Sequence, residues 1–179
     1  VNVSDICAMN GEAKQITIGL AISNRFTVEA LEEFYQGIKL ACIEYGVDLV
    51  GGDTTSSVSG LMISVSILGE VEKNKITFRS GANINDLVVC TGDLGAAYLG
   101  LQLLNRENTI FKENPKMQPD LSGHDYVLRR QLRPEAATKY TRILRELEIT
   151  PTSMIDISDG LSSEVLHLAK ASHVGITIH

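Results

Sequence analysis

Five aspartates occupy positions at which a carboxylate could take part in binding or catalysis. Asp53, Asp93, Asp156 and Asp159 each follow an apolar run that gives way to a loop or helix, and Asp5 lies in a short helical segment. In mixed α/β folds ligands bind near strand ends, because the loops there converge over a rigid sheet. The four aspartates that follow apolar runs are therefore candidate binding residues.

Carboxylates gathered around an anionic substrate would repel it, which restricts the chemistry they can support. Two like unit charges about 4 Å apart cost on the order of 4 kcal/mol at an effective dielectric of about 20. A divalent cation reverses that sign, and Mg²⁺ binds a few carboxylate oxygens together with water and substrate phosphate oxygens. Aspartates beside glycine-rich turns therefore indicate nucleotide phosphates bridged by metal ions.

Each of these motifs also has a purely structural interpretation. Ser158 and Asp159 precede an apolar helical run and are typical N-cap residues, and residues 51–54 can form a plain turn. Three further candidates can be ordinary surface or core residues: Asp5, Arg79 and Tyr35. Composition and periodicity alone predict a site for Mg²⁺ and phosphate without specifying the reaction.

The apolar periodicity of the first half alternates between helices and strands. Residues 3–9 have helical spacing, and residues 16–22 and 63–67 alternate as strands with one buried face do. Between these strands Thr27 can cap a helix that Gly46 ends in the left-handed conformation. The expected buried stripe of this helix comprises Leu31, Phe34, Tyr35, Ile38, Ala41, Cys42 and Tyr45.

The second half begins again with an expected buried strand at residues 87–91. A helix through Leu104 follows, and residues 105–123 are expected to form a loop because they contain two of the four prolines. Further helices are predicted at residues 125–132 and 134–147, with Pro134 at the first helical position. A short strand at residues 154–157 then leads into a helix that opens with Ser158-Asp159-Gly160.

These elements predict an α/β or α+β fold with two mixed-sheet sub-domains. The polar turn at residues 72–75 marks the expected boundary, which divides the chain into domains 1–74 and 75–179. The sequence starts inside an apparent helix, and residues 176–179 alternate like the first half of a strand. We therefore expect the chain to be truncated at both termini.

Composition excludes several classes of protein. The net charge is −6 and there is no run of Lys or Arg, which argues against a nucleic-acid partner. No apolar stretch reaches the roughly 18–20 residues of a membrane span. The three cysteines are widely spaced and odd in number, as expected for free thiols in a cytoplasmic protein.

Five motifs occur together in an order that specifies the interpretation further. They are Asn2-Val3-Ser4-Asp5-Ile6 with Ala8-Met9, Leu49-Val50-Gly51-Gly52-Asp53-Thr54-Thr55, Arg79-Ser80-Gly81-Ala82 with Asp86, Thr91-Gly92-Asp93-Leu94-Gly95 with Gly100-Leu101, and Asp156-Ile157-Ser158-Asp159-Gly160-Leu161. In this order and spacing the chain resembles the thiamine-monophosphate kinases. Their superfamily also includes aminoimidazole ribonucleotide synthetase, selenophosphate synthetase and a hydrogenase maturation factor. The second and fifth motifs favour the kinases over the synthetases.

The resemblance implies a role for each matching residue. It places Mg²⁺ on four aspartates: Asp5, Asp53, Asp156 and Asp159. It places ATP against Tyr35, Gly52, Asp53, Arg79 and Ser158, with Tyr35 on the adenine side. It also implies that the N-terminal domain, residues 1–74, pairs with a second copy in a homodimer, with the ATP site near the subunit interface.

The implied reaction is Mg²⁺-dependent transfer of a phosphoryl group from ATP to thiamine monophosphate, giving thiamine diphosphate by in-line displacement. The acceptor is already anionic, so no acid/base residue is assigned and catalysis would rest on positioning and charge neutralisation. Two alternatives remain: a superfamily member with another acceptor, of the purine-biosynthesis or selenophosphate synthetase type, and a non-catalytic member of the fold. We expect these 179 residues alone to be nearly inactive, because the resemblance places further ligands outside them.

Overall fold

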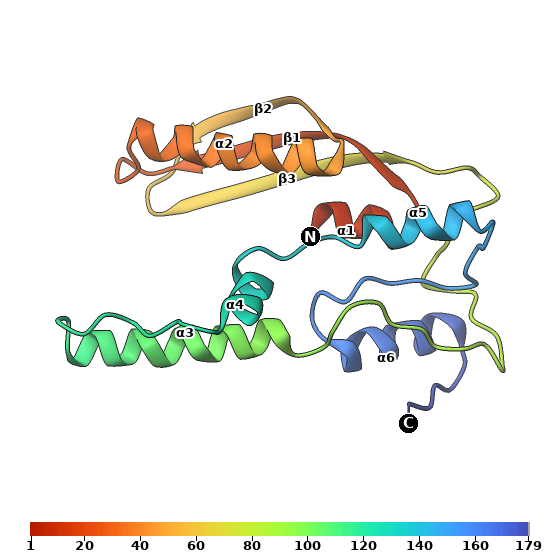
Figure 1. Cartoon of the computed structure of the whole chain (residues 1–179). Coiled ribbons are helices and arrows are strands. Elements are labelled where there is room, and N and C mark those ends of the chain that lie inside the picture. Colours follow the sequence, from red (N-terminus) through yellow and green to blue (C-terminus); the bar gives the residue numbers. More distant parts are fainter. Residues whose placement is uncertain (179) are drawn as a thin grey trace. The chain divides into compact units, whose positions relative to one another are not determined.

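The computed structural model describes residues 1–178, and contacts between residues divide the chain into two compact units. The sheet unit comprises Val1–Leu87 together with the residues from Ala137 onwards. The helix-pair unit comprises Val88–Ala136. Both are drawn in Figure 1, and each is described separately below.

A three-stranded mixed sheet forms the centre of the sheet unit, with the strand order β2-β1-β3. β1 (Glu12–Ile22) pairs in parallel with β2 (Asp48–Ser56) and antiparallel with β3 (Leu61–Glu70) (Figure 1). Ile18 and Leu20 of β1 are only 2% and 3% exposed. The predicted strands at residues 16–22 and 63–67 are confirmed, and so is the mixed α/β fold.

Helix α2 (Val28–Tyr45) connects the parallel strands β1 and β2 and has the predicted caps. The Thr27 hydroxyl accepts a hydrogen bond from the Ala30 N–H (3.2 Å), and Gly46 ends the helix at φ 64°. The predicted apolar stripe is half-buried at most of its positions, but Tyr35 and Ala41 are exposed. The interpretation of Tyr35 as a core residue is therefore wrong, since none of the α2 side chains is fully buried.

Three further helices complete the sheet unit: α1 (Asn2–Cys7), α5 (Thr138–Glu146) and α6 (Leu161–Ser172). Helix α1 contacts β1, β3 and α5, and its Cys7 is 5% exposed. Burial raises the pKa of the Cys7 thiol, so the neutral thiol is favoured in this apolar contact. Arg145 of α5 forms an ion pair with Glu12 of β1 (3.0 Å).

The ion pairs of Glu12 give a testable dependence of stability on pH. Its carboxylate accepts hydrogen bonds from Lys14 (2.6 Å) and Arg145 (3.0 Å), and both lower its pKa, Lys14 most strongly. A lowered folded-state pKa stabilises the fold above the ordinary glutamate value of about 4.3, and this stabilisation is lost as the pH falls through the folded-state pKa. We expect Glu12→Gln to reduce the free energy of unfolding at pH 7 by less than about 1 kcal/mol, because the pair is half exposed.

The measurement is urea unfolding of both proteins from about pH 7 down to about pH 2, with the difference shrinking below about pH 5. The matched control is Glu33→Gln on the exposed side of α2. A Glu12→Gln deficit that stayed constant down to the lowest pH would rule out the charge of Glu12 as its cause.

The helix-pair unit consists of α3 (Ala96–Glu113) and α4 (Asp125–Leu132), which pack against each other. α3 is nine residues longer than predicted, so the expected loop at residues 105–123 is wrong over its first half. The buried Glu107 explains part of this difference. Its carboxylate forms an ion pair with Arg106 (2.8 Å) and accepts a hydrogen bond from the Asp120 N–H (2.9 Å). Pro115 follows the helix and excludes its continuation.

Several other expected boundaries differ from the structure. Residues 87–91, 154–157 and 176–178 form no strand, and His179 lies outside the described residues. α5 begins at Thr138 rather than at Pro134, which lies in the segment that returns to the sheet unit. Asp53 lies within β2 rather than after a strand. A strand requires a partner for its backbone N–H and C=O groups, and sequence periodicity does not identify that partner.

Some expectations about the chain as a whole concern features beyond secondary structure. In the described part of the chain, no helix is both long and apolar enough to span a membrane. The three cysteines are free, as predicted, but Cys90 is exposed rather than buried. Residues 75–87 share the sheet unit with residues 1–74. The division into domains 1–74 and 75–179 stays a prediction.

Candidate functional site

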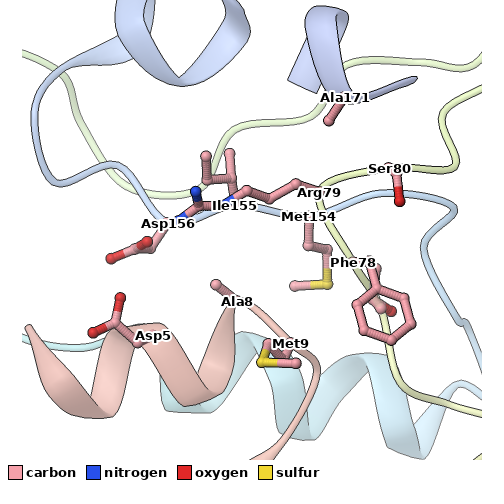
Figure 2. Close-up of a pocket in the computed structure, with 11 residues that line it drawn as sticks. Asp5, Ala8, Met9, Phe78, Arg79, Ser80, Met154, Ile155, Asp156 and Ala171 are labelled. Carbon is pink, nitrogen blue, oxygen red and sulfur yellow. The ribbon is translucent and has the colours of Figure 1, made fainter. Parts of the chain in front are cut away.

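A cavity of about 470 Å³ lies within the sheet unit and brings together three of the sequence motifs. Its walls come from the end of α1, from the segment at residues 77–80, from residues 154–156, and from one residue of α6 (Figure 2). The lining residues are Asp5, Ala8, Met9, Thr77, Phe78, Arg79, Ser80, Met154, Ile155, Asp156 and Ala171. Residues more than 140 positions apart in the sequence therefore share one cavity.

Two of the predicted metal ligands face each other across this cavity. Asp5 projects from α1 and Asp156 from the segment opposite, and their carboxylates point toward one another (Figure 2). Asp5 is exposed and Asp156 is half-buried, so both are accessible to a ligand in the cavity. Mg²⁺ is commonly bound through one or two carboxylates with phosphate and water completing its shell, and this donor pair fits that requirement.

The third charged group of the cavity is Arg79. Its side chain extends along residues 154–156 toward Asp156 (Figure 2). Among the residues the structure describes, no carboxylate lies within ion-pair distance of its guanidinium. A guanidinium presents several N–H donors and binds phosphate oxygens well. The cavity therefore offers both carboxylates for a metal ion and a cation for phosphate.

Backbone hydrogen bonds fix the three walls of the cavity relative to one another. The Met154 N–H donates to the Phe78 carbonyl (3.0 Å), and the Thr77 N–H donates to the Met9 carbonyl (3.2 Å). Asn10, buried in the left-handed turn after α1, donates through its side-chain amide to the Lys75 carbonyl (3.0 Å). The segment that contains Arg79 is thus joined on one side to α1 and on the other to the segment of Asp156.

The other two predicted metal ligands do not line the cavity. Asp53 pairs with Gly19 in the sheet, and its carboxylate accepts a hydrogen bond from the Thr54 N–H (2.9 Å). Asp159 is exposed and its backbone N–H donates to the buried Glu164 (3.1 Å). Residues 1–178 contain no group of three or more His, Cys, Asp or Glu side chains placed to hold a metal ion. The four-aspartate metal site stays a prediction, and the structure brings together Asp5 and Asp156.

The remaining residues predicted to contact ATP also lie outside the cavity. Tyr35 is 37% exposed on α2 and stacks edge-on against Phe34, with the ring centroids 5.6 Å apart. Gly52 lies in β2, where a Cβ would come within 2.1 Å of the Ile18 carbonyl oxygen. Ser158 is exposed, and the N-cap of α6 is Gly160 rather than Ser158 or Asp159. The interpretation of those two residues as the N-cap is therefore wrong.

Asp93, the remaining aspartate of the motifs, belongs to the helix-pair unit and is tied to α4. Its carboxylate lies 3.3 Å from Arg130 Nε. A hydrogen bond to Asp93 raises the pKa of Tyr126, because the carboxylate stabilises the protonated phenol. The structure thus assigns Asp93 a local role in anchoring the loop before α3.

Sequence reasoning missed two groups that shape the candidate site. The first is the apolar lining of the cavity, which includes Met9, Phe78 and Met154. The second is Glu164, which is only 5% exposed and holds the Asp159 backbone. Its place in the first turn of α6 was a usable signal, since acidic side chains there often bind unpaired N–H groups.

Comparison with known proteins identifies relatives along the whole chain. Residues 1–71 match the family described as AIR synthase related protein, N-terminal domain. The thiamine-monophosphate kinase of Bacillus subtilis (strain 168) is 36% identical over 178 residues, covering 99% of this chain and 52% of that protein. The thiamine-monophosphate kinase of Aquifex aeolicus (strain VF5) is 35% identical over 179 residues, covering 99% and 53%.

The similarity extends to three-dimensional structure. A solved structure described as AaThiL complexed with AMPPCP and TMP has a TM-score of 0.80 and 34% sequence identity, covering 96% of this chain and 51% of that one. The chain therefore spans about half the length of the relatives it matches.

Proposed function

This chain is related along 99% of its length to thiamine-monophosphate kinases and matches the AIR synthase related N-terminal domain over residues 1–71. From this premise we propose that the complete protein transfers a phosphoryl group from ATP to thiamine monophosphate, in a reaction that depends on Mg²⁺. The reaction products would be ADP and thiamine diphosphate.

The cavity of the sheet unit is the observation that supports this proposal most directly. Its two facing carboxylates, Asp5 and Asp156, suit a divalent cation, and Arg79 beside them suits a phosphate. No serine–histidine or cysteine–histidine pair lines the cavity, whose residues are all described. This composition favours phosphoryl transfer by positioning and charge neutralisation over acid/base or nucleophilic catalysis by the protein.

In this proposal each side chain of the cavity has a distinct task. Asp5 and Asp156 hold the metal, which when bound supplies positive charge to align two anionic phosphates. Arg79 binds phosphate oxygens and neutralises charge on the side of the cavity next to Asp156. The acceptor phosphate is already ionised near neutral pH, so no residue needs to remove a proton from it.

The proposal also includes residues that lie outside the cavity. Asp53 and Asp159 would complete the metal site, and ATP would further contact Tyr35, Gly52 and Ser158. We propose a cytoplasmic homodimer, with the ATP site near the interface of two N-terminal domains. The exposed position of Tyr35 on α2 is compatible with a contact to adenine.

The test is transfer of label from γ-labelled ATP to thiamine monophosphate by the complete protein, with and without Mg²⁺. Labelled thiamine diphosphate that appears only with Mg²⁺ is the expected result. Nucleotide binding without this product would overturn the acceptor assignment and direct the search to other phosphate or carboxylate acceptors of the superfamily. The absence of nucleotide binding would overturn the kinase assignment as a whole.

A further inference from the structure

The hydroxyl group of Ser172, the last residue of α6, lies at the centre of a hydrogen-bond cluster beneath Arg79. Its oxygen accepts hydrogen bonds from the backbone N–H groups of Gly81 (3.2 Å) and Ala82 (3.1 Å). The same hydroxyl donates to the backbone carbonyl of Arg79 (3.3 Å). One side chain of α6 is thus bonded to three backbone groups of the segment that contains Arg79.

These three bonds use the full hydrogen-bonding capacity of a serine. A hydroxyl has one hydrogen to donate and two lone pairs to accept with, and all three are occupied here. A threonine could reproduce the set because it has the same hydroxyl group. An alanine would leave two N–H groups and part of one carbonyl without these partners.

The backbone that Ser172 holds adopts a conformation that needs support. Gly81 has φ 123°, which side-chain-bearing residues rarely adopt, and a Cβ there would lie 2.5 Å from the Thr152 carbonyl oxygen. Residues 79–81 are otherwise exposed, so packing contributes little to their position. A second hydroxyl, that of Ser153, donates to the Arg79 carbonyl (2.7 Å) from the other side.

Further along, the same segment has its own tether, which acts at a different point. The Asp86 carboxylate accepts hydrogen bonds from the Thr152 hydroxyl (2.7 Å) and from the Asn83 N–H (2.7 Å). These bonds lower the pKa of Asp86, the Thr152 bond most strongly, so the carboxylate is ionised near neutral pH. The Asp86 tether fixes the segment beyond residue 82, whereas Ser172 fixes the residues that directly follow Arg79.

We propose that Ser172 is a positioning residue that holds the Arg79 backbone so that the guanidinium faces the cavity beside Asp156. This inference rests on the proposed function, in which Arg79 binds phosphate. The neighbouring residue Ala171 lines the same cavity, so the end of α6 is adjacent to the site it would organise. Ser172 itself does not line the cavity and would act only through Arg79.

The experiment compares Ser172→Ala and Ser172→Thr with the wild type in the complete protein. Because Arg79 would bind ATP before the reaction, loss of its positioning should raise KM for ATP about 10-fold and change kcat less than about twofold. Ser172→Thr should retain a KM within about twofold of the wild type. The matched control is Ser162→Ala, which removes an exposed hydroxyl from the same helix and should leave both constants unchanged.

A second readout does not depend on turnover. Hydrogen exchange of the Gly81 and Ala82 amides should be at least about 10-fold faster in Ser172→Ala, with the melting temperature nearly unchanged. Nucleotide affinity, measured by titration with a non-hydrolysable ATP analogue, should fall by the same factor as KM rises.

Two results would overturn the inference: nucleotide affinity that is unchanged in Ser172→Ala, or Ser172→Thr as impaired as Ser172→Ala. A wild-type protein that binds nucleotide but makes no thiamine diphosphate would instead contradict the proposed acceptor. In that case the affinity and exchange measurements still decide the role of Ser172.

Discussion

Replacement of Asp156 by asparagine should lower Mg²⁺-dependent phosphoryl transfer by about 100-fold or more while leaving the protein folded. Asp156 faces Asp5 across the cavity and is one of only two carboxylates that line it. Asparagine has nearly the same shape but no charge, so it would bind a divalent cation far more weakly. Since Asp156 has no ion pair among the described residues, its replacement breaks none.

The measurement is the labelled-ATP assay at increasing Mg²⁺, together with a thermal unfolding curve. We expect Asp156→Asn to need much more Mg²⁺ for any residual turnover and to melt within a few degrees of the wild type. Asp48→Asn, at the exposed start of β2 and away from the cavity, is the control. Normal turnover of Asp156→Asn at low Mg²⁺ would remove this residue from the metal site.

The same assay decides the place of Asp53, which the resemblance assigns to the metal but which lies in β2, outside the cavity. If Asp53→Asn is as inactive as Asp156→Asn, the metal site extends from the cavity to the sheet. Turnover near that of the wild type would confine the metal ligands to the cavity walls.

The largest effect on stability is expected from Gly100→Ala in the helix-pair unit. A Cβ at Gly100 would lie 2.2 Å from the Val127 carbonyl oxygen of α4, which is much closer than van der Waals contact allows. The obstacle is backbone rather than a flexible side chain, so α3 and α4 would have to move apart. We expect a loss of about 3 kcal/mol or more in the free energy of unfolding of this unit.

Gly37 in the middle of α2 provides the matched control, because a Cβ there would meet nothing within 4 Å. In that open position alanine is the better helix former, and Gly37→Ala should stabilise the protein by about 0.5–1 kcal/mol. Both variants are measured by denaturant unfolding, with helix content followed by circular dichroism. Similar effects of the two substitutions would show that close packing at Gly100 does not govern the result.

The sequence predicted local features of the fold well where neighbouring residues determine them. Thr27 and Gly46 bound α2 as expected, because a cap depends only on side chains and backbone within one helical turn. β1 was likewise predictable, since alternation of apolar residues is a property of the strand itself. The strand expected at residues 87–91 fails for the complementary reason, because a strand also needs a partner that periodicity does not specify.

The candidate site was predictable in its residues but not in its geometry. Asp5, Arg79 and Asp156 were each selected from a separate motif, and the structure places them around one cavity. Their convergence depends on long-range hydrogen bonds such as the one from Met154 to Phe78, which leave no local signature in the sequence. The role of Ser172 is of this kind, because a serine at the end of a helix has many ordinary explanations.

The helix-pair unit interrupts the sheet unit in the chain, and this has a consequence for the order of assembly during synthesis. Arg79 leaves the ribosome 93 residues before Ser172, an interval of roughly 5–20 s at typical rates of translation. During that time the segment that holds Arg79 lacks its partners Ser153 and Ser172, whereas Val88–Ala136 is already complete and can fold. The nascent protein therefore acquires its phosphate-binding cavity late, after the inserted helices have formed.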